Sequence, residues 1–461
     1  MNKAKQLGGL LVSVLGLVLV VACSDGDSNN SGFKSARLPI VFVHGQSGSA
    51  QQFETQAMRF TSNDYPQELL FAFEYDTDQA DNPLADLDTF IDGVLARTGA
   101  RKVYAIGHSR GTSVWTSYLE DPAFDGPAKV ARYVNIDGRS PAELPGGVPT
   151  IGIWGEWNTA NSGYNRRDDN SNAQIGPDPA DNYYFADKSH TETATSAEAF
   201  GLMYRFLLGR EAQTTDVLMA GSELVDVAGR AVYFPQNTGF AGATLQLWKI
   251  DAASGQRSTD TPEATVQIGT SGDFGPLRLE KNGAYELALL RGPTEAQPLA
   301  TVHHFYPEPF VRDNYFFRLN SSVPGGGIEG FIPAEENATS MVIQRQREFW
   351  GDQGAGSDEI FIDGLSVLTP AISPRTGVYL ALFLSDEDSD QTTDLDKGEV
   401  FPYTLQTILT GADVFIPSQF EGAGTVQVVL VTRGGGETTL NVPNWPSSTN
   451  RISVMFRDDT P

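Results

Sequence analysis

The stretch KVYAIGHSRGTSVWTSYL, residues 102–119, decides the fold of the first half of this chain. It begins as a short apolar run, typical of a strand buried on both faces of a parallel sheet, and it ends with helical spacing of its apolar residues. Between the two stands GHSRG, residues 107–111, which matches the pattern G-x-S-x-G. The stretch therefore predicts a tight turn from strand to helix with Ser109 at its tip.

The context of this turn makes Ser109 a candidate nucleophile. Glycines on both sides permit strained backbone angles and let the helix pack close behind the strand. The hydroxyl group would stand clear of the sheet at the amino end of a helix, where the helix dipole favours a developing negative charge. A serine in an ordinary glycine turn is the alternative, and it accounts for neither the preceding strand nor the following helix.

From Leu38 to about Arg210, short apolar runs alternate with stretches of helical spacing. The runs are LPIVFVHG, LLFAFEYD, KVYAIGHS, VARYVNID and VPTIGIWGE. Helical spacing covers residues 84–96 and 112–119 and the closing stretch AEAFGLMYRFLLG. Alternation of strand and helix is the pattern of an α/β domain. We predict such a domain, with a mostly parallel central sheet, over residues 37–212.

The second half of the chain has a different character. From residue 213 on, Val, Thr, Tyr and Phe come in short alternating runs such as TLQLWKI, YELALL and VQVVLV, separated by Gly, Pro, Asn and Asp. This pattern is typical of all-β structure. We predict one or two sandwich-like β domains, divided as 213–304 and 305–461, or one continuous β body over both ranges.

The charge of the chain limits its partners. The formal net charge is −26 at pH 7, so a phosphate backbone or an anionic membrane surface would be repelled. We therefore expect no nucleic-acid partner. The chain has a single cysteine, Cys23, which excludes an intrachain disulfide. The sequence does not indicate an oligomeric state.

The amino-terminal segment resembles that of a bacterial lipoprotein. Two lysines precede the apolar run GGLLVSVLGLVLVVA, residues 8–22, which has signal-peptide length and ends directly before Cys23. We predict a signal peptide over 1–22, acylation of Cys23 and a flexible tether over 23–36. A plain signal peptide or an anchor helix is the alternative. The expected location is the outer membrane or surface of a bacterial cell, or the medium after release.

A nucleophilic serine needs a base to take its proton, and histidine is the usual one. Of the five histidines, His44 lies in the VFVHG turn, His108 neighbours the serine, and His303 and His304 lie in the β half. His190 remains, in the polar loop DKSHTETATS before the last predicted helix. We therefore predict that His190 is the base. A surface histidine without a role is the alternative.

The carboxylate that orients the base is predicted to be Asp137. It ends the strand segment VARYVNID, and carboxylates at strand ends point into the site crevice of such sheets. After the next strand, the position at which an aspartate is commonly found holds Asn158. Glu156, in the same segment, is the alternative acid.

Two main-chain amides are candidates for holding an oxyanion. The turn after the first strand carries the amide of Gln46, and the amide of Arg110 directly follows the candidate nucleophile. Such donors each lower the barrier to a tetrahedral intermediate by about 3 kcal/mol. The Arg110 side chain either favours an acidic or polar substrate or faces solvent, and the sequence does not choose between them.

A metal site is a weaker prediction. Asp386, Asp388 and Asp390 stand at alternate positions, a spacing that can gather oxygen ligands around calcium. The segment lacks the glycine expected of an EF-hand loop, so a solvated acidic loop is the favoured interpretation. We expect no organic cofactor.

The chain resembles the archaeal-type lipases, in which an α/β-hydrolase domain is followed by a large C-terminal β domain. The similar segments are VFVHGQSGSAQQFETQAMRF, NDYP, FEYDT, GHSRGT, PAKVARYVNIDG and SHTETATSAEAF. At the matching positions the resemblance places the nucleophile on Ser109, the acid on Asp137 and the base on His190, as the chemical reasoning does. It implies an ester or lipid substrate and a β half that helps to bind lipid.

The expected function is therefore hydrolysis of carboxylic esters through an acyl-enzyme, as in a lipase or esterase. Acyl chain length stays open. Two alternatives remain. One is a hydrolase of polyester or other acyl substrates with the same triad. The other is a surface lipoprotein that binds lipid or glycan and carries a vestigial hydrolase domain.

Overall fold

The computed structural model describes residues 37–155, 174–178, 181–185, 187–351, 356–374, 377–405 and 408–458. The predicted signal peptide and tether, with Cys23, lie outside these residues, and so does Glu156. Within the described ranges, no helix has both the length and the apolar character needed to cross a membrane.

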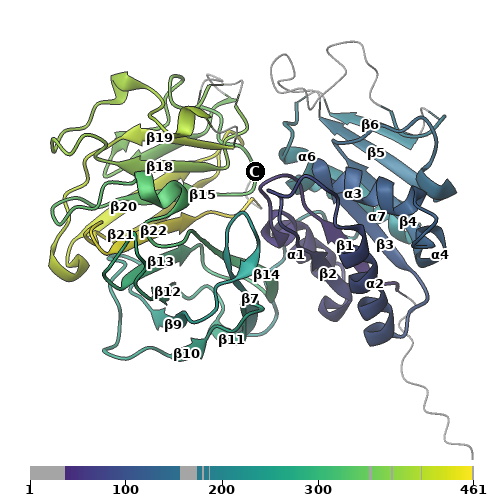
Figure 1. Cartoon of the computed structure of the whole chain (residues 1–461), viewed down its shortest axis with the longest axis horizontal. Coiled ribbons are helices and arrows are strands. Elements are labelled where there is room, and N and C mark those ends of the chain that lie inside the picture. Colours follow the sequence, from purple (N-terminus) through teal and green to yellow (C-terminus); the bar gives the residue numbers. More distant parts are fainter. Residues whose placement is uncertain are drawn as a thin grey trace, which may run out of the picture. The chain divides into compact units, whose positions relative to one another are not determined.

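Six parallel strands form the sheet of the first half, in the order β2-β1-β3-β4-β5-β6 (Figure 1). They are β1 (Ile40–Val43), β2 (Leu70–Phe73), β3 (Val103–His108), β4 (Val130–Ile136), β5 (Thr150–Gly155) and β6 (Asn182–Phe185). Every residue of β1 and β5 is buried. Helices cover both faces of the sheet, which explains why these strands are apolar at consecutive positions.

Two layers of helices bury the two faces. The helices are α1 (Glu54–Ser62), α2 (Leu84–Thr98), α3 (Arg110–Glu120), α4 (Gly126–Lys129), α6 (Glu192–Thr195) and α7 (Ala197–Leu208). Val41 and Val43 of β1 share a core with α2 and α3. Ile40 and Phe42, on the opposite face, share a core with α1 and α7. The prediction of an α/β domain with a parallel sheet is confirmed.

The sequence pattern did not reveal α1 or β6. All residues of α1 from Glu54 to Phe60 are buried, polar ones included, because this helix is covered by the sheet on one side and by the β region on the other. The usual alternation of an apolar face with a polar face is therefore missing.

The second half is all β, as predicted. Its strands are β7 (Leu224–Tyr233), β8 (Thr238–Gly239), β9 (Thr244–Lys249), β10 (Ala264–Gln267), β11 (Asp273–Glu280), β12 (Tyr285–Arg291), β13 (Thr301–Pro307), β14 (Asn314–Ser321), β15 (Met341–Gln344), β16 (Glu359–Ile362), β17 (Leu365–Ser366), β18 (Ala381–Ser385), β19 (Leu409–Asp413), β20 (Thr425–Val431), β21 (Glu437–Pro443) and β22 (Asn450–Met455).

One eight-stranded sheet runs through the whole β half, in the order β10-β9-β12-β13-β22-β15-β18-β19 (Figure 1). The sheet β11-β7-β14 packs on one part of it and the sheet β17-β16-β20-β21 on another, which makes two sandwich cores. The predicted division between residues 304 and 305 falls inside β13, and β13 pairs with β22 from the end of the chain. The sheet therefore continues across residues 304 and 305, and the division of the β half into domains stays a prediction.

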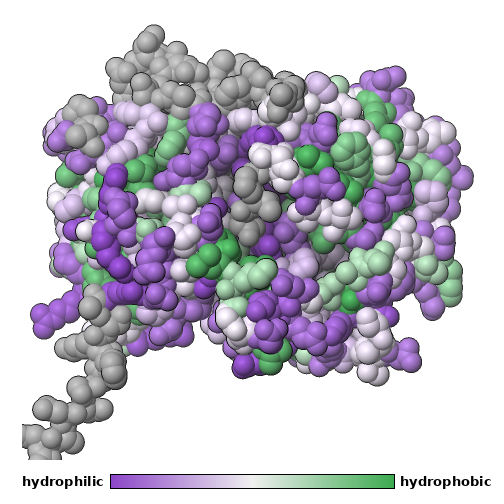
Figure 2. Space-filling model, turned by 180° about the vertical axis from the view of Figure 1, so that it is seen from behind, coloured by the Kyte–Doolittle hydropathy of each residue, from purple (hydrophilic) through white to green (hydrophobic). Residues whose placement is uncertain are grey.

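Side chains of the β half reach the α/β domain through β7 and β14. Phe316 of β14 lies edge-on to Phe42 of β1, with ring centroids 5.6 Å apart. The carboxylate of Glu74 accepts hydrogen bonds from Arg318 at 2.7 Å and from Arg230 at 2.6 Å. Arginine pairs of this kind, largely removed from water, fix the orientation of the elements that they join. The face of the molecule in Figure 2 is mostly hydrophilic with small apolar patches, as the net charge of −26 leads one to expect.

Candidate active site

Ser109 occupies the turn between β3 and α3, with φ 51° and ψ −122°. A positive φ is unfavourable for a residue with a Cβ atom and costs about 1–3 kcal/mol. The Ser109 amide donates to the carbonyl oxygen of Ile136, at the end of β4, over 2.9 Å. The Ser109 carbonyl accepts from the Thr112 amide over 3.0 Å. The strand-to-helix turn lies where the sequence predicts it, and it is held by the neighbouring strand.

Glycines around this turn permit contacts that no other residue allows. A Cβ atom on Gly111 would lie 2.2 Å from the Val43 carbonyl oxygen, and one on Gly107 would lie 2.8 Å from the Trp115 ring. A Cβ atom on Gly45 would lie 2.9 Å from the Cβ atom of Ser109. The turn after β1 and the turn after β3 are therefore in contact, which brings the predicted oxyanion segment against Ser109.

Asp137 and His190 form a buried pair at the same edge of the sheet. Oδ2 of Asp137 lies 2.6 Å from Nδ1 of His190, and Oδ1 accepts the Gly155 amide at 3.1 Å. An ionised carboxylate only accepts hydrogen bonds, so Nδ1 of His190 carries the proton, and Nε2 of the neutral ring is unprotonated. Burial lowers the pKa of His190 to about 4, and the Glu348 carboxylate acts in the opposite direction. The ring is a neutral base at pH 7.

The loop that carries His190 lies beside the turn that carries Ser109. The rings of His108 and His190 have centroids 4.5 Å apart, and Nε2 of His108 donates to the His190 carbonyl oxygen at 2.9 Å. The structure therefore brings Ser109, Asp137 and His190 to one edge of the sheet. Their roles stay predictions, and so does the preference for Asp137 over Glu156.

His108 also connects this loop with the turn after β1, residues 44–48, which carries the predicted oxyanion donor Gln46 and is here named the oxyanion turn. Because its Nε2 atom donates to a carbonyl group, its Nδ1 atom is an acceptor in the neutral ring. Nδ1 accepts a hydrogen bond from the side-chain NH2 group of Gln52 at 2.7 Å. Oε1 of Gln52, in the short helix η1 (Ala50–Phe53), accepts the Gly45 amide at 3.1 Å. Burial holds the pKa of His108 well below its usual value, which suits these neutral contacts. Two side chains thus link the two turns.

The two predicted oxyanion donors lie on either side of the contact between the turns. Among the described residues, neither the Gln46 amide nor the Arg110 amide has a hydrogen-bond partner. The Gln46 side chain donates to the Thr77 carbonyl oxygen at 2.8 Å and accepts from the Arg110 guanidinium at 2.8 Å. Both backbone segments are thus anchored by their side chains while their amides stay available.

The Arg110 side chain is half-buried and binds the neighbouring loop. Its guanidinium donates to the carbonyl oxygens of Thr77, Gln79 and Asp81 and lies 5.5 Å from the centre of the Tyr75 ring. Several of these contacts are exposed, so the guanidinium faces solvent while it donates to carbonyl oxygens. It closes the loop 76–81 over the oxyanion turn.

The β half contributes a residue to the same turn. The Nδ2 atom of Asn237, between β7 and β8, donates to the carbonyl oxygens of Gly48 at 2.9 Å and Tyr75 at 3.1 Å. Asn237 is 5% exposed and has a φ of 55°. The His44 ring stacks on Tyr75 with centroids 4.6 Å apart, and burial lowers its pKa to about 4. His44 is thus a neutral structural part of the turn.

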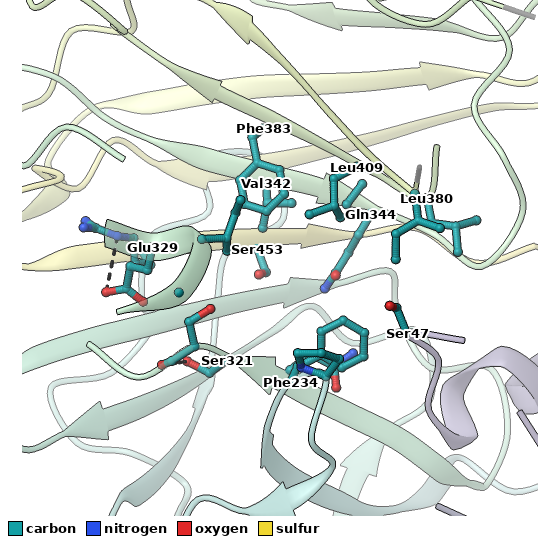
Figure 3. A pocket seen from close by; sticks show the side chains of 18 of the residues that line it. Ser47, Phe234, Ser321, Glu329, Val342, Gln344, Leu380, Phe383, Leu409 and Ser453 are labelled. Atoms are coloured by element: carbon teal, nitrogen blue, oxygen red, sulfur yellow. Dashed lines mark hydrogen bonds and ion pairs between the residues drawn. The ribbon is translucent and has the colours of Figure 1, made fainter. Parts of the chain in front are cut away.

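A cavity of about 740 Å³ opens beside the oxyanion turn, with Ser47, Gly48 and Ser49 in its wall. Asp78 of the loop 76–81 also lines it, and the remaining walls come from the β half and are mainly apolar. In Figure 3, Phe383, Leu409 and Leu380 face Phe234 and Ser47 across this space. Two further lining residues, Phe331 and Phe401, are 55% and 57% exposed and meet edge to face at 5.6 Å. The cavity thus offers an apolar binding space next to the candidate oxyanion site.

Three family models match consecutive parts of this chain. The model of lipase (class 2) matches residues 37–119, and the model of the lipase C-terminal domain matches residues 223–324. The first half of the chain thus contains a segment similar to class 2 lipases, and the second half one similar to lipase C-terminal domains. A further model, described as a C-terminal domain, matches residues 327–460.

The chain is also similar to several solved structures. A gene product of Listeria innocua is 16% identical over 39% of this chain and 97% of that chain, with a TM-score of 0.30. Bacillus licheniformis lipase BlEst2 is 16% identical over 37% and 92%, with a TM-score of 0.28. Legionella pneumophila phospholipase PlaB is 10% identical over 59% and 90%, also with a TM-score of 0.28. The fold assignment rests on the sheet order and strand register described above.

The predicted calcium ligands lie together in the structure. Carboxylate oxygens of Asp386, Asp388 and Asp390 lie within 4.8 Å of one another, with Asp386 buried and the other two exposed. The Lys397 ammonium lies 2.8 Å from Asp388 and also binds Asp413. A positive charge is thus already supplied beside the cluster, and calcium binding there stays a prediction.

Sequence reasoning missed Gln52 and Asn237. Gln52 reaches His108 across 56 positions, and Asn237 reaches Gly48 across 189. Neither residue is part of a motif with a known spacing. The one available signal was that Gln52 lies inside a segment that resembles the lipase family.

Proposed function

We propose that this chain hydrolyses carboxylic esters through an acyl-enzyme on Ser109, with His190 as general base and Asp137 as the group that orients it. The observation that carries the proposal is the buried hydrogen bond between Nδ1 of His190 and Asp137, 2.6 Å long, beside the strained turn of Ser109. With the proton on Nδ1, Nε2 of the neutral imidazole is the basic nitrogen that can take a hydroxyl proton.

The proposed reaction has two halves. In the first, Nε2 of His190 takes the Ser109 proton while Oγ attacks the ester carbonyl carbon, and the amides of Gln46 and Arg110 receive the negative oxygen. The protonated His190 then gives this proton to the leaving alcohol oxygen, and the acyl group stays on Ser109. In the second half, His190 activates a water molecule in the same way, and the carboxylic acid is released.

The electrostatics of the site support this cycle. Because the pKa of His190 is lowered to about 4 by burial, the free enzyme holds a neutral base at pH 7. The imidazolium that forms during attack would be unfavourable in a buried site without a counter-charge. Asp137, fully buried and in direct contact with the ring, supplies that charge.

The cavity supports an ester with a long apolar acyl group as the substrate class. Its volume of about 740 Å³ and its apolar walls suit a hydrocarbon chain, and its wall includes the segment that follows the Gln46 amide. We therefore infer that long-chain esters are better substrates than short-chain esters.

The test compares hydrolysis of short-chain and long-chain nitrophenyl esters by the wild type, Ser109→Ala and Ser113→Ala. Ser113 lies on α3, four residues after Ser109, and its side chain has no assigned part in the reaction. We expect Ser109→Ala to lose activity and Ser113→Ala to retain it. A phosphonate inhibitor should add its mass to a peptide that contains Ser109. Equal rates for the wild type and Ser109→Ala would eliminate the proposed triad.

The two alternative functions are distinguished by the same protein samples. A panel of aliphatic polyesters alongside acylglycerols tests for a polyester hydrolase that uses Ser109. A vestigial hydrolase domain on a binding lipoprotein predicts that no ester is turned over and that the phosphonate does not react.

We further propose that the protein is anchored at the outer membrane or cell surface through acylated Cys23. The apolar run before this cysteine supports the proposal. In cells fed with labelled palmitate, the wild type should carry the label and Cys23→Ser should not. A labelled Cys23→Ser variant would rule out this attachment.

A further inference from the structure

The loop that carries His190 is held on both sides of the histidine by one carboxylate from the β half. Oε1 of Glu348 accepts the Thr191 amide at 2.7 Å, and Oε2 accepts the Ser189 hydroxyl. The side chains of Ser189, His190 and Thr191 are buried, and Glu348 is only 1% exposed. A single anionic group thus bridges the residue before His190 and the residue after it, across 157 positions of sequence.

The position of Glu348 is itself fixed. It follows β15, and its carbonyl oxygen accepts hydrogen bonds from the guanidinium groups of Arg345 at 2.5 Å and Arg433 at 2.8 Å. Both arginines also bind Asp358, at 2.5 Å and 2.9 Å. Asp358 in turn accepts the Trp350 amide at 2.9 Å. The carboxylate of Glu348 therefore extends from a backbone that charged, buried side chains hold in place.

A second contact ties the same loop to the same cluster. Glu192, two residues after His190, lies 2.6 Å from the Arg433 guanidinium and 3.9 Å from that of Arg347. Lys188, two residues before His190, lies 3.8 Å from Glu192. The loop is thus attached to the β half at three positions that flank His190.

We propose that Glu348 is a positioning residue for His190, so that the base of the active site is held by the β half while its orienting acid comes from the hydrolase domain. This inference rests on the proposed function, and it adds that the hydrolase domain does not complete its own site. Glu348 contacts the neighbours of His190 and takes no part in the chemistry. Its effect is to keep Nε2 of His190 directed at Ser109 throughout the reaction cycle.

The charge of Glu348 also acts on His190. The titratable groups that face the ring from the hydrolase domain are Asp137 and His108. From the β half the nearest is Glu348, whose negative charge raises the pKa of His190 against the effect of burial. The flanking groups Lys188, Glu192, Arg347 and Arg433 pair among themselves.

Glu348 is ionised in spite of its burial. Burial alone would raise its pKa, but the hydrogen bonds from Ser189 and Thr191 and the charge of Arg433 bring its pKa below the usual value. A carboxylate at this position therefore supplies both a rigid bridge and a negative charge, and the two effects are separable by substitution.

Two substitutions separate the bridge from the charge. Glu348→Gln keeps the shape but removes the charge; its amide oxygen can still accept the Thr191 amide, and its NH2 group can donate to the Ser189 hydroxyl. Glu348→Ala removes both the bridge and the charge. Glu286→Gln is the matched control, because Glu286 is equally buried and accepts a hydrogen bond from a histidine, His304, but lies in the core of the β half. The measurements are kcat and KM for a nitrophenyl ester, the pH profile of kcat/KM, and an NMR titration of the His190 ring in the full chain.

We expect Glu348→Ala to lose about 10- to 100-fold in kcat with little change in KM, because a displaced base impairs the chemical step and not binding. Glu348→Gln should retain most of kcat. In both variants the acid limb of the pH profile and the NMR midpoint of His190 should move to lower pH. Glu286→Gln should change none of these quantities.

The inference is overturned if Glu348→Ala has the kcat of Glu286→Gln, or if the His190 midpoint is unchanged in Glu348→Gln. Should Glu348→Ala not fold, Glu348→Gln decides through its pH profile and NMR midpoint. A wild type that hydrolyses no ester contradicts the proposed function and not the link between Glu348 and His190, because the NMR titration needs no substrate.

Discussion

The Nδ1 atom of His190 lies 2.6 Å from Oδ2 of Asp137, a residue 53 positions earlier in the chain. Asp137 follows β4 directly, whereas His190 stands in a loop before α6. The contact sets the ring tautomer, because an ionised carboxylate cannot donate. It therefore decides which ring nitrogen is available for proton transfer.

Replacement of Asp137 by Asn should reduce kcat by about 10⁴-fold, since an amide favours the wrong tautomer of His190. The matched substitution at the alternative acid, Glu156→Gln, should leave kcat within about threefold of the wild type. Steady-state kinetics on one ester provide both values. The opposite ranking would assign the orienting role to Glu156.

Arg110→Ala should lower kcat/KM by about tenfold, because the loop 76–81 and the Gln46 side chain lose the donor that holds them. The loss should be the same for neutral and for anionic esters, since the guanidinium is already engaged by carbonyl groups. Arg139→Ala, which removes a half-exposed charge, serves as the control. A selective loss with anionic esters would restore the interpretation of Arg110 as a substrate-binding cation.

Asn237→Ala should destabilise the fold by about 1–3 kcal/mol, because the carbonyl groups of Gly48 and Tyr75 lose a buried donor. A side chain at φ 55° adds strain, so Asn237→Gly isolates the hydrogen bonds from the backbone effect. Urea unfolding measures both variants. If Asn237→Gly is as stable as the wild type, the side-chain contacts contribute no more than the backbone strain that glycine relieves.

A large side chain at Val342 should fill the cavity beside the oxyanion turn. Val342→Trp should therefore lower kcat/KM for a long-chain ester by about tenfold or more, while a short-chain ester serves as the internal control and keeps its rate. Equal changes with both esters would show that the acyl group does not bind in this cavity.

Acid should destabilise the protein through its buried histidines. Burial lowers the pKa of His44 and His190 to about 4 and holds the pKa values of His108 and His303 well below the usual 6.5. As the pH falls below 6.5 the unfolded chain binds protons that the folded chain does not. Each such histidine then removes about 1.4 kcal/mol of unfolding free energy per pH unit.

Glu54 acts in the opposite direction. Burial raises its pKa from 4.5 to about 7, so between these values the folded state alone binds its proton, and stability falls as the pH rises. Four histidines lower the free energy of unfolding as the pH falls, and only Glu54 raises it. Urea unfolding should therefore show a net loss of stability toward pH 4.5. Glu54→Gln should steepen that loss. A free energy of unfolding that does not depend on pH in this range would contradict the assignment.

Much of the candidate site was predictable because its signals are local. The turn at Ser109 follows from a strand, two glycines and a helix within 18 consecutive positions of the printed sequence. In the structure, a Cβ atom on either glycine, Gly107 or Gly111, would clash with its neighbours. The carboxyl ends of parallel strands meet at one edge, so Asp137 could be placed near Ser109 without coordinates. His190 followed from the small number of histidines.

The amino-acid sequence alone determined the alternation of strand and helix, the all-β second half and the candidate residues Ser109, Asp137 and His190, because each depends on the chemistry of a few neighbouring positions. Only the tertiary structure decided that β13 pairs with β22 in one sheet, that Asn237 holds the oxyanion turn and that Glu348 holds the His190 loop. These contacts join residues more than a hundred positions apart, where spacing carries no information and only the packing of complete domains selects the partner.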